Sequence, residues 1–236
     1  MPALKRVGHK GADLIAPGNT RESFDAALAA GVDMIEFDVL PLRDRDGLIL
    51  AHDYLDASRR TPLTLAEGLD HLCGPGLAEL DLDVDLKLPG YEEEVLGELR
   101  ERGMVGRVLI TSQYRESLAR VRAVEPAARV GWSVPRARRD YTASPLTIVP
   151  ALGLLAAGRA SLPALAARAI RSGAIDAIMA HWRLVTPRLA RSVRAAGGEL
   201  YVWTVDDLET IRRLAAMGVD GIITNDPRLF VRLQPA

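Results

Sequence analysis

Cysteine is almost absent from this sequence of 236 residues, in which Cys73 is the single example. One cysteine cannot form an internal disulfide or supply the thiolate cluster of a structural zinc site. The chain is therefore compatible with a reducing compartment. Histidine is scarce as well, with four residues, so any metal site would have to rely mainly on carboxylates.

The sequence also lacks an excess of charge and a long apolar run. Its 30 basic and 31 acidic side chains leave a formal charge of −1, so no strong global field would attract nucleic acid or an anionic membrane. An anionic substrate must then be bound locally. No stretch approaches ~20 apolar residues, and residues 1–5 contain no apolar leader-like segment. We expect a cytoplasmic protein without a membrane span or a nucleic-acid partner; the oligomeric state is left open.

An open doubly wound sheet is the alternative fold for a chain of alternating strands and helices. It is disfavoured because no strand-like segment is followed by a glycine-rich phosphate loop. Instead, eight short β-type segments alternate with helical ones, which predicts a single domain, residues 1–236, with a TIM-type (β/α)8 barrel. The expected strands are Arg6–His9, Met34–Val39, Asp81–Lys87, Val108–Ser112, Arg129–Ser133, Ala177–Ala180, Leu200–Thr204 and Gly221–Thr224. The expected helices are Thr20–Ala30, Thr64–Cys73, Tyr91–Arg102, Arg115–Val124, Leu162–Ser172, Pro187–Ala196, Asp206–Met217 and a short one from Pro227.

Three further local features are predicted. Leu48–His52 is expected to form an extra strand in a hairpin with the second barrel strand. Arg136–Ala160 contains several prolines and is expected to be a long loop with an irregular helix over one mouth of the barrel. Asn19, Thr186 and Asp206 are typical helix N-cap residues at three expected helix starts.

Ionisable residues gather at the expected strand ends, where the active sites of β/α barrels lie. Glu36 and Asp38 interrupt an apolar strand, and Asp83, Asp85 and Lys87 follow the same alternation in the next barrel strand. Buried carboxylates need a counter-charge, and an all-oxygen set favours Mg²⁺ or Ca²⁺ over softer metals. The residues alone thus predict a divalent metal site in this cluster.

His9 and His52 also fall at expected strand ends, beside these carboxylates. Two imidazoles across a phosphate are suited to act as acid and base in phosphodiester cleavage. A packed, structural role is the alternative for each ring taken alone, and the pairing favours catalysis. His71 lies within an expected amphipathic helix and receives no role. His181 directly follows the sixth expected strand, and only its position connects it with the site.

Several motifs at both ends of the chain resemble the glycerophosphodiester phosphodiesterase family, in order and in spacing. They are Gly8-His9-Lys10-Gly11, Ala16-Pro17-Gly18-Asn19-Thr20, Gly31-Val32-Asp33-Met34-Ile35-Glu36-Phe37-Asp38-Val39, Ala51-His52-Asp53, Asp85-Leu86-Lys87, Val202-Trp203-Thr204-Val205-Asp206-Asp207 and Gly218-Val219-Asp220-Gly221-Ile222-Ile223-Thr224-Asn225-Asp226-Pro227. Residues 114–196 are supported mainly by the strand and helix alternation.

The resemblance implies a role for each matched position. His9 and His52 would be the acid and base, while Glu36, Asp38 and Asp85 would be the ligands of a divalent metal, Mg²⁺ or Ca²⁺. Lys10, Lys87 and Trp203 would contact the substrate, Trp203 as a wall for its glycerol moiety. In such enzymes a hydroxyl next to the phosphate is the nucleophile, and water later opens the cyclic intermediate.

The sequence departs from the family pattern at four places. Lys10 stands where arginine is usual and loses the planar fork that binds phosphate bidentately. Asp85 replaces a glutamate and Gly18 replaces the glutamate of Pro-Glu-Asn-Thr. Only eleven residues, 53–63, separate His52 from the next expected helix, so the family's capping insertion is much shortened.

The resemblance therefore predicts hydrolysis of a small glycerophosphodiester to sn-glycerol 3-phosphate and an alcohol. Two rival functions are open. One is a phospholipase D-like or lysophospholipase D-like enzyme acting on lipid, which would favour an apolar or basic rim, for which the sequence offers only the cluster of Arg136, Arg138 and Arg139. The other is a catalytically inactive barrel used for binding, which the competent side chains at every expected site position disfavour.

Overall fold

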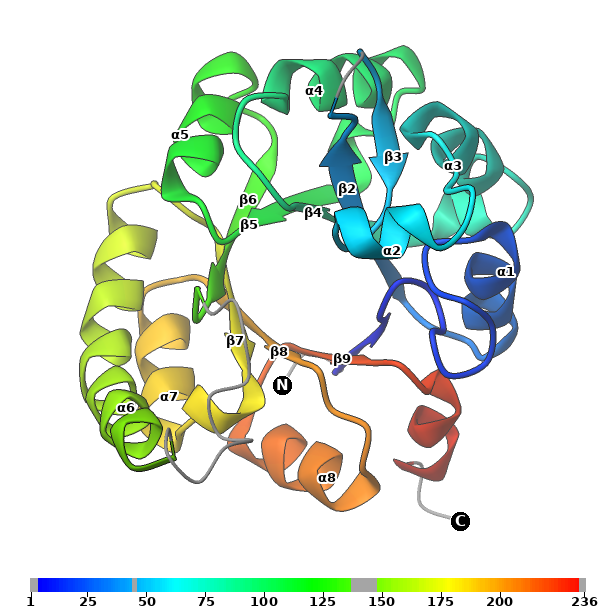
Figure 1. The fold of residues 1–236 in the computed structure, drawn as a ribbon. Coiled ribbons are helices and arrows are strands. Elements are labelled where there is room, and N and C mark those ends of the chain that lie inside the picture. Colours follow the sequence, from blue (N-terminus) through cyan, green and yellow to red (C-terminus); the bar gives the residue numbers. More distant parts are fainter. Residues whose placement is uncertain (1–3, 44–45, 137–147, 234–236) are drawn as a thin grey trace.

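The computed structural model describes residues 4–43, 46–136 and 148–233 and contains a closed barrel of parallel strands inside a ring of helices (Figure 1). The strands are β1 (Lys5–Gly8), β2 (Met34–Pro41), β3 (Leu48–Leu50), β4 (Asp81–Leu86), β5 (Val108–Ser112), β6 (Arg129–Val134), β7 (Ala177–His181), β8 (Glu199–Trp203) and β9 (Gly221–Thr224). The helices are α1 (Arg21–Ala29), α2 (Tyr54–Ser58), α3 (Leu65–Leu72), α4 (Glu92–Glu101), α5 (Arg115–Val124), α6 (Ile148–Arg171), α7 (Pro187–Ala195) and α8 (Leu208–Met217). The predicted TIM-type (β/α)8 barrel is confirmed, with most element ends within one or two residues of their expected positions.

The barrel closes because β1 pairs in parallel with both β9 and β2, which joins the first and last units. The remaining parallel pairs follow chain order, from β2 with β4 around to β8 with β9. β3 is the exception, since it pairs antiparallel with β2 outside the barrel register. The predicted hairpin is thus present, although its strand ends at Leu50 rather than at His52.

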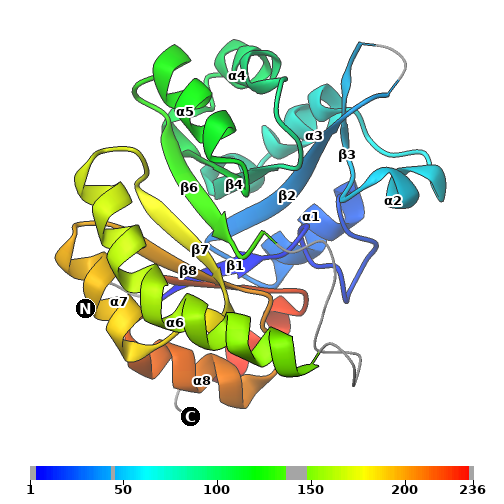
Figure 2. The ribbon, with the colours of Figure 1, turned by 60° about the vertical axis from the view of Figure 1, so that its left-hand side comes forward.

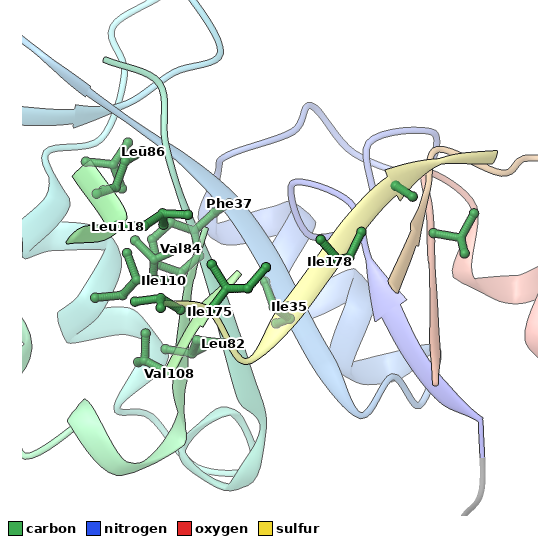
Figure 3. Close-up of a cluster of buried hydrophobic side chains, with 14 of the residues drawn as sticks. Ile35, Phe37, Leu82, Val84, Leu86, Val108, Ile110, Leu118, Ile175 and Ile178 are labelled. Carbon is green, nitrogen blue, oxygen red and sulfur yellow. The ribbon is translucent and has the colours of Figure 1, made fainter. Parts of the chain in front are cut away.

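Strand alternation separates two environments within the barrel wall. On β2, Ile35 and Phe37 point outward into the main hydrophobic core between strands and helices, beside Val84 and Ile110 (Figure 3). The barrel interior holds a smaller apolar cluster that includes Met34. Because Met34 faces inward, Glu36 and Asp38 face inward as well, above that apolar layer and toward the carboxyl ends of the strands.

Two of the three predicted N-cap residues are corrected by the structure. Thr186 caps α7 as expected, but Thr20 caps α1 in place of Asn19, and Asp207 caps α8 in place of Asp206. In both cases the adjacent residue provides the capping oxygen within hydrogen-bonding distance of the third backbone N–H of the helix. Asn19 and Asp206 are thereby left free for other contacts.

The helix predicted within Arg136–Ala160 is present in the part that the structure describes, but it was wrongly expected to be irregular and separate from the next helix. Residues 148–160 form the first half of one long helix, α6, which packs beside α7 (Figure 2). Pro150 lies in the first turn, where the missing N–H has no helical partner in any case, and the following stretch is rich in alanine and leucine, which favour helix. Residues 137–147, including Arg138 and Arg139 of the expected basic cluster, lie outside the described residues.

The connection after β3 is short, as the sequence predicts, and it contains the five-residue helix α2. Among the helices in the described part of the chain, none is long and apolar enough to cross a membrane.

Candidate active site

The turn after β1 presents His9 at the mouth of the barrel. At Gly8 a Cβ atom would lie 2.1 Å from the carbonyl oxygen of Gly11, so this close backbone approach requires glycine. Gly11 has a φ of 86° and packs against Ser23, so it too has no room for a side chain. Lys10 adopts a positive φ of 50° and donates its backbone N–H to Glu36 Oε2 at 2.8 Å. The Gly8–Gly11 motif is therefore a tight turn that holds His9 against the carboxylates of β2.

The pairing of β2 with β4 brings the acidic residues side by side. In the parallel register Glu36 lies opposite Asp83, and Asp38 lies opposite Asp85. Neighbouring strands are about 4.8 Å apart, so in-register side chains on one face touch. Glu36, Asp38 and Asp85 each place one carboxylate oxygen within 4.8 Å of the other two, which is the geometry of a cation site.

Electrostatics around this cluster show an excess of negative charge. Burial, together with repulsion from Asp38, raises the pKa of Glu36 well above its usual value. Burial raises the pKa of Asp83 to about 8, and repulsion from Asp85 adds to this, although the Thr111 hydroxyl donates a hydrogen bond to Asp83 at 2.6 Å. Burial and mutual repulsion thus favour the protonated form of these carboxyl groups, as expected where the positive charge nearby is too small to balance them.

The cation present is Lys87, whose ammonium lies between Asp38 and Asp85, at 2.5 Å from Asp85 Oδ2. Burial opposes the charge of Lys87, but attraction to Asp38 and Asp85 outweighs it and raises the pKa of the ammonium. Burial likewise opposes the charge of Asp38, and Lys87 outweighs it and lowers the pKa of that carboxyl.

The donor set fits a divalent cation. Asp38 Oδ1 is buried and has no well-oriented hydrogen-bond donor, although the Lys87 ammonium lies beside it. Glu36, Asp38 and Asp85 together outnumber the charge that Lys87 supplies. A hard cation would bind such oxygens and supply the missing charge, and it would compete with Lys87 for Asp38 and Asp85.

Asn19 holds the carboxylate of Asp38 in place. Its side-chain N–H donates to Asp38 Oδ2 at 3.0 Å, and its oxygen accepts the backbone N–H of Asp38 at 3.1 Å. Asn19 has a φ of 59°, a left-handed conformation that asparagine tolerates better than most residues. The sequence indicated a helix cap here because a cap and a residue that supports a neighbouring carboxylate use the same short polar side chain.

One pocket of about 160 Å³ at the mouth contains most of the predicted site. Its walls include His9, Glu36, His52, Asp85, Lys87 and Trp203. His52 precedes α2, and its ring is 53% exposed and lies 3.3 Å from Asp53 Oδ2. Trp203 ends β8 and donates its indole N–H to the carbonyl of Met179 at 2.9 Å, so it is both a packed residue and a pocket wall.

The ammonium of Lys10 lies against Asp13, at 3.3 Å, and is not among the groups that line the pocket. Attraction to Asp38 and Asp13 outweighs the burial of this side chain and raises its pKa. His71, which was assigned no role from the sequence, lies on α3 beside Asp25 and away from the pocket. His181 contacts the rings of Trp182 and Trp203 at the mouth.

A further polar part of the pocket wall was missed from the sequence. It is formed by Thr111, Gln113 and Ser133 at the ends of β5 and β6, and Thr111 lies directly beside the acidic cluster. These neutral side chains lack the charge that singled out the other positions. They could have been predicted only from their position at the carboxyl ends of barrel strands, where active-site residues of such barrels lie.

Comparison with known proteins gives the family. The family model described as "Glycerophosphoryl diester phosphodiesterase family" matches residues 9–66 and 81–229, which is most of the chain and includes every predicted site residue. The chain belongs to this family.

Individual members of the glycerophosphoryl diester phosphodiesterase family align with nearly the whole chain. Bacillus subtilis YhdW, a proposed glycerophosphodiester phosphodiesterase, is 27% identical over 96% of this chain and 96% of its own length. The glycerophosphodiester phosphodiesterase of Caldanaerobacter subterraneus is 24% identical, again over 96% of each chain. An Oleispira antarctica phosphodiesterase, solved with its product sn-glycerol-3-phosphate, shares the fold with a TM-score of 0.69 at 18% identity, covering 97% of this chain and 95% of that one.

Proposed function

We propose that this chain hydrolyses small glycerophosphodiesters to sn-glycerol 3-phosphate and an alcohol, with a divalent cation as its cofactor. The observation that carries the proposal is the cluster of Glu36, Asp38 and Asp85, whose oxygens lie within 4.8 Å of one another in the pocket region that also contains His9 and His52. The family membership and the named activity of the relatives support it.

Glu36, Asp38 and Asp85 would hold the cation, Mg²⁺ or Ca²⁺, with Asn19 fixing the middle ligand. When bound, the cation would withdraw charge from the phosphate oxygens and stabilise the negative charge that develops on them. Lys87 would exchange part of its contact with Asp38 and Asp85 for a phosphate oxygen, since Lys87 lines the pocket.

His9 and His52 are the proton carriers of the proposed reaction. One imidazole takes the proton of the substrate hydroxyl next to the phosphate, whose oxygen then bonds to phosphorus. The other gives a proton to the alcohol oxygen as its bond to phosphorus breaks. The second step reverses these roles, because water attacks the cyclic phosphate and the ring oxygen leaves with a proton.

The remaining predicted contacts are with the glycerophosphate half of the substrate. Trp203 presents its indole as one wall of the pocket, which suits the carbon chain of glycerol. Lys10 contributes long-range attraction for phosphate in this proposal, because its ammonium pairs with Asp13 outside the pocket lining.

A lipid-like substrate is the second candidate, and two exposed side chains favour it. Leu14 is 61% exposed on the loop after β1, and Leu55 is 60% exposed on α2. Both segments follow strands at the carboxyl end of the barrel, and the Leu14 backbone N–H bonds to the carbonyl of Asn225 beside His9. An acyl chain could cover such a rim.

Product analysis separates the two candidates. The enzyme with Mg²⁺ or Ca²⁺ is incubated with sn-glycero-3-phosphocholine or with lysophosphatidylcholine, and the products are identified by ³¹P NMR. We expect sn-glycerol 3-phosphate from the first substrate at a much higher kcat/KM than any product from the second. Faster release of choline from the lysolipid would favour the lipid candidate, and no reaction with either would favour an inactive barrel.

A further inference from the structure

A hydrogen-bonded chain of side chains runs from solvent to His9 and involves two residues to which the mechanism above gives no role. His9 Nδ1 lies 2.5 Å from Asn225 Oδ1. The Asn225 side-chain N–H donates to Asp206 Oδ2 at 2.7 Å. The chain therefore links the ends of β8, β9 and β1, which are neighbours in the barrel.

Asp206 is firmly held at the outer end of this chain. Its Oδ1 accepts the backbone N–H of Asn225 at 2.8 Å and the hydroxyl of Thr224 at 3.0 Å, while Oδ2 accepts the Asn225 amide. Three donors from the β9 end thus fix both carboxylate oxygens. Asp206 can make these contacts because the adjacent Asp207, and not Asp206, caps α8.

The orientation of the Asn225 amide follows from the chemistry of its neighbour. A carboxylate can only accept hydrogen bonds, so the amide must turn its NH₂ group to Asp206 and its oxygen to His9. An amide oxygen can only accept, so His9 Nδ1 must donate. The proton of a neutral His9 ring then resides on Nδ1, and Nε2 carries the lone pair.

His9 Nε2 is the nitrogen that faces the site. It lies 3.8 Å from Glu36 Oε2, and His9 lines the pocket. A free lone pair on Nε2 is required to take a proton there, and a proton on Nε2 can be given up there only if Nδ1 keeps its own. One fixed orientation therefore serves both proton-transfer roles.

We propose that Asp206, through Asn225, is a positioning pair that fixes the tautomer and the orientation of His9. The expected effect on kcat rests on the proposed phosphodiesterase function. The tautomer of His9 can be measured whether or not the protein has that activity. Groups that hold the second nitrogen of a functional histidine typically change activity by about 10–100-fold when removed.

The test uses three variants of the cation-loaded full chain and one control variant. Asp206→Asn keeps one oxygen for the backbone N–H of Asn225 and places a donor NH₂ group where Oδ2 accepts from the Asn225 amide, and Asn225→Ala removes the amide. The double variant Asp206→Asn/Asn225→Asp reverses the pair, since the new amide can donate to the new carboxylate, which still accepts from His9. Asp226→Asn is the matched control, because Asp226 lies next to Asn225 but pairs with Arg228 on the surface.

Two readouts are measured, the tautomer of His9 by ¹⁵N NMR of labelled imidazoles and kcat and KM with sn-glycero-3-phosphocholine. In the wild type and in Asp226→Asn we expect the Nδ1–H form. In Asp206→Asn and in Asn225→Ala we expect a population with the proton on Nε2 and a kcat lower by about 10–100-fold with KM little changed. The double variant should recover the Nδ1–H form and most of the kcat.

An unchanged His9 tautomer in Asp206→Asn and Asn225→Ala would overturn the proposal, whatever the activity of these two variants. Failure of Asp206→Asn to fold leaves the decision with Asn225→Ala and the double variant. If the wild type does not cleave the phosphodiester, the proposed function fails, and the NMR spectra still decide whether Asp206 and Asn225 set the tautomer.

Discussion

His9 and His52 line the same pocket but are held to very different degrees. The His9 side chain is 20% exposed and bonds to Asn225, whereas the His52 side chain is 53% exposed and has one contact of 3.3 Å with Asp53. A ring with so few contacts contributes little to the stability of the fold. Replacing it should therefore change the rate of the reaction and leave the fold almost unchanged. A loss of activity at His52 would therefore report on the reaction.

We predict that His52→Ala lowers kcat by ~10²- to 10⁴-fold, the usual effect of losing a general acid or base. The melting temperature should hardly change. His71→Ala is the control for activity, since His71 also lies beside an aspartate but away from the pocket. Steady-state kinetics and thermal denaturation of both variants are the measurements. A normal kcat in His52→Ala would remove this residue from the mechanism.

Charged residues on the barrel strands could be predicted as site residues from the sequence, whereas the polar residues that support them could not. Glu36 and Asp38 stand out because a carboxylate is costly at a buried strand position. Asn19 and Asp206 lie next to the residues that cap α1 and α8, and a sequence does not show which of two adjacent polar residues makes the cap. Their contacts with Asp38 and Asn225 depend on segments that meet only in the folded barrel.

Strand β2 has one face for the site and one for the core, and these faces should respond to mutation in opposite ways. Phe37 is fully buried in the outer core, where its ring lies 5.9 Å from that of Phe24. We predict that Phe37→Ala lowers the free energy of unfolding by about 3–5 kcal/mol, as large-to-small core substitutions of phenylalanine do. Urea denaturation measures this loss.

Glu36→Gln, one residue away, should leave the free energy of unfolding of the cation-free protein unchanged or higher. It replaces a buried carboxyl whose pKa is raised by burial with a neutral group of the same shape. Its affinity for Mg²⁺ or Ca²⁺, measured by calorimetry, should fall by at least ~10-fold. Equal losses of stability in both variants would contradict the inward placement of Glu36.

The elements with regular alternation could be predicted closely, whereas α6 was predicted closely only in its second half, as Leu162–Ser172. The sequence of α6 has a proline near each end of its first half, Pro150 and Pro163, and prolines usually indicate breaks. Pro150 is tolerated because it lies in the first turn. Pro163 is tolerated inside the helix, with the neighbouring Leu162 buried against the rest of the core, so tertiary packing outweighs the local preference.

The short segment after β3 gives little cover to the mouth of the barrel. Residues 53–63 contain only the five-residue helix α2, held by Arg60, which bonds to Asp56 and to the carbonyl of Leu50. Few side chains from this segment can contact the leaving alcohol. Selectivity should then reside in the glycerophosphate half of the substrate.

We predict that glycerophosphodiesters of choline, ethanolamine, glycerol and similar alcohols differ in kcat/KM by no more than ~10-fold, as expected where few contacts differ. Steady-state kinetics with four or five such substrates measure the spread. A kcat/KM several hundred-fold higher for one alcohol would contradict this prediction. It would mean that other groups at the mouth, such as Gln113 and Ser133, contact the leaving alcohol and discriminate between substrates.

At the scale of the whole molecule, the barrel concentrates charge that the chain as a whole lacks. The net charge is −1, yet Glu36, Asp38, Asp83 and Asp85 meet on two adjacent strands in a parallel register. The fold therefore produces a local field that composition does not show. Because the barrel wall places these carboxylates before any ligand arrives, a bound cation is needed to balance them in the working enzyme.

The most direct test of this central claim is hydrolysis of sn-glycero-3-phosphocholine before and after removal of metal. The purified protein is treated with a chelator, the chelator is removed, and activity is measured without addition and after titration with Mg²⁺ or Ca²⁺. We predict that the treated protein is inactive, stays folded by circular dichroism, and recovers its activity with one of these ions. Full activity after exhaustive metal removal would contradict the account.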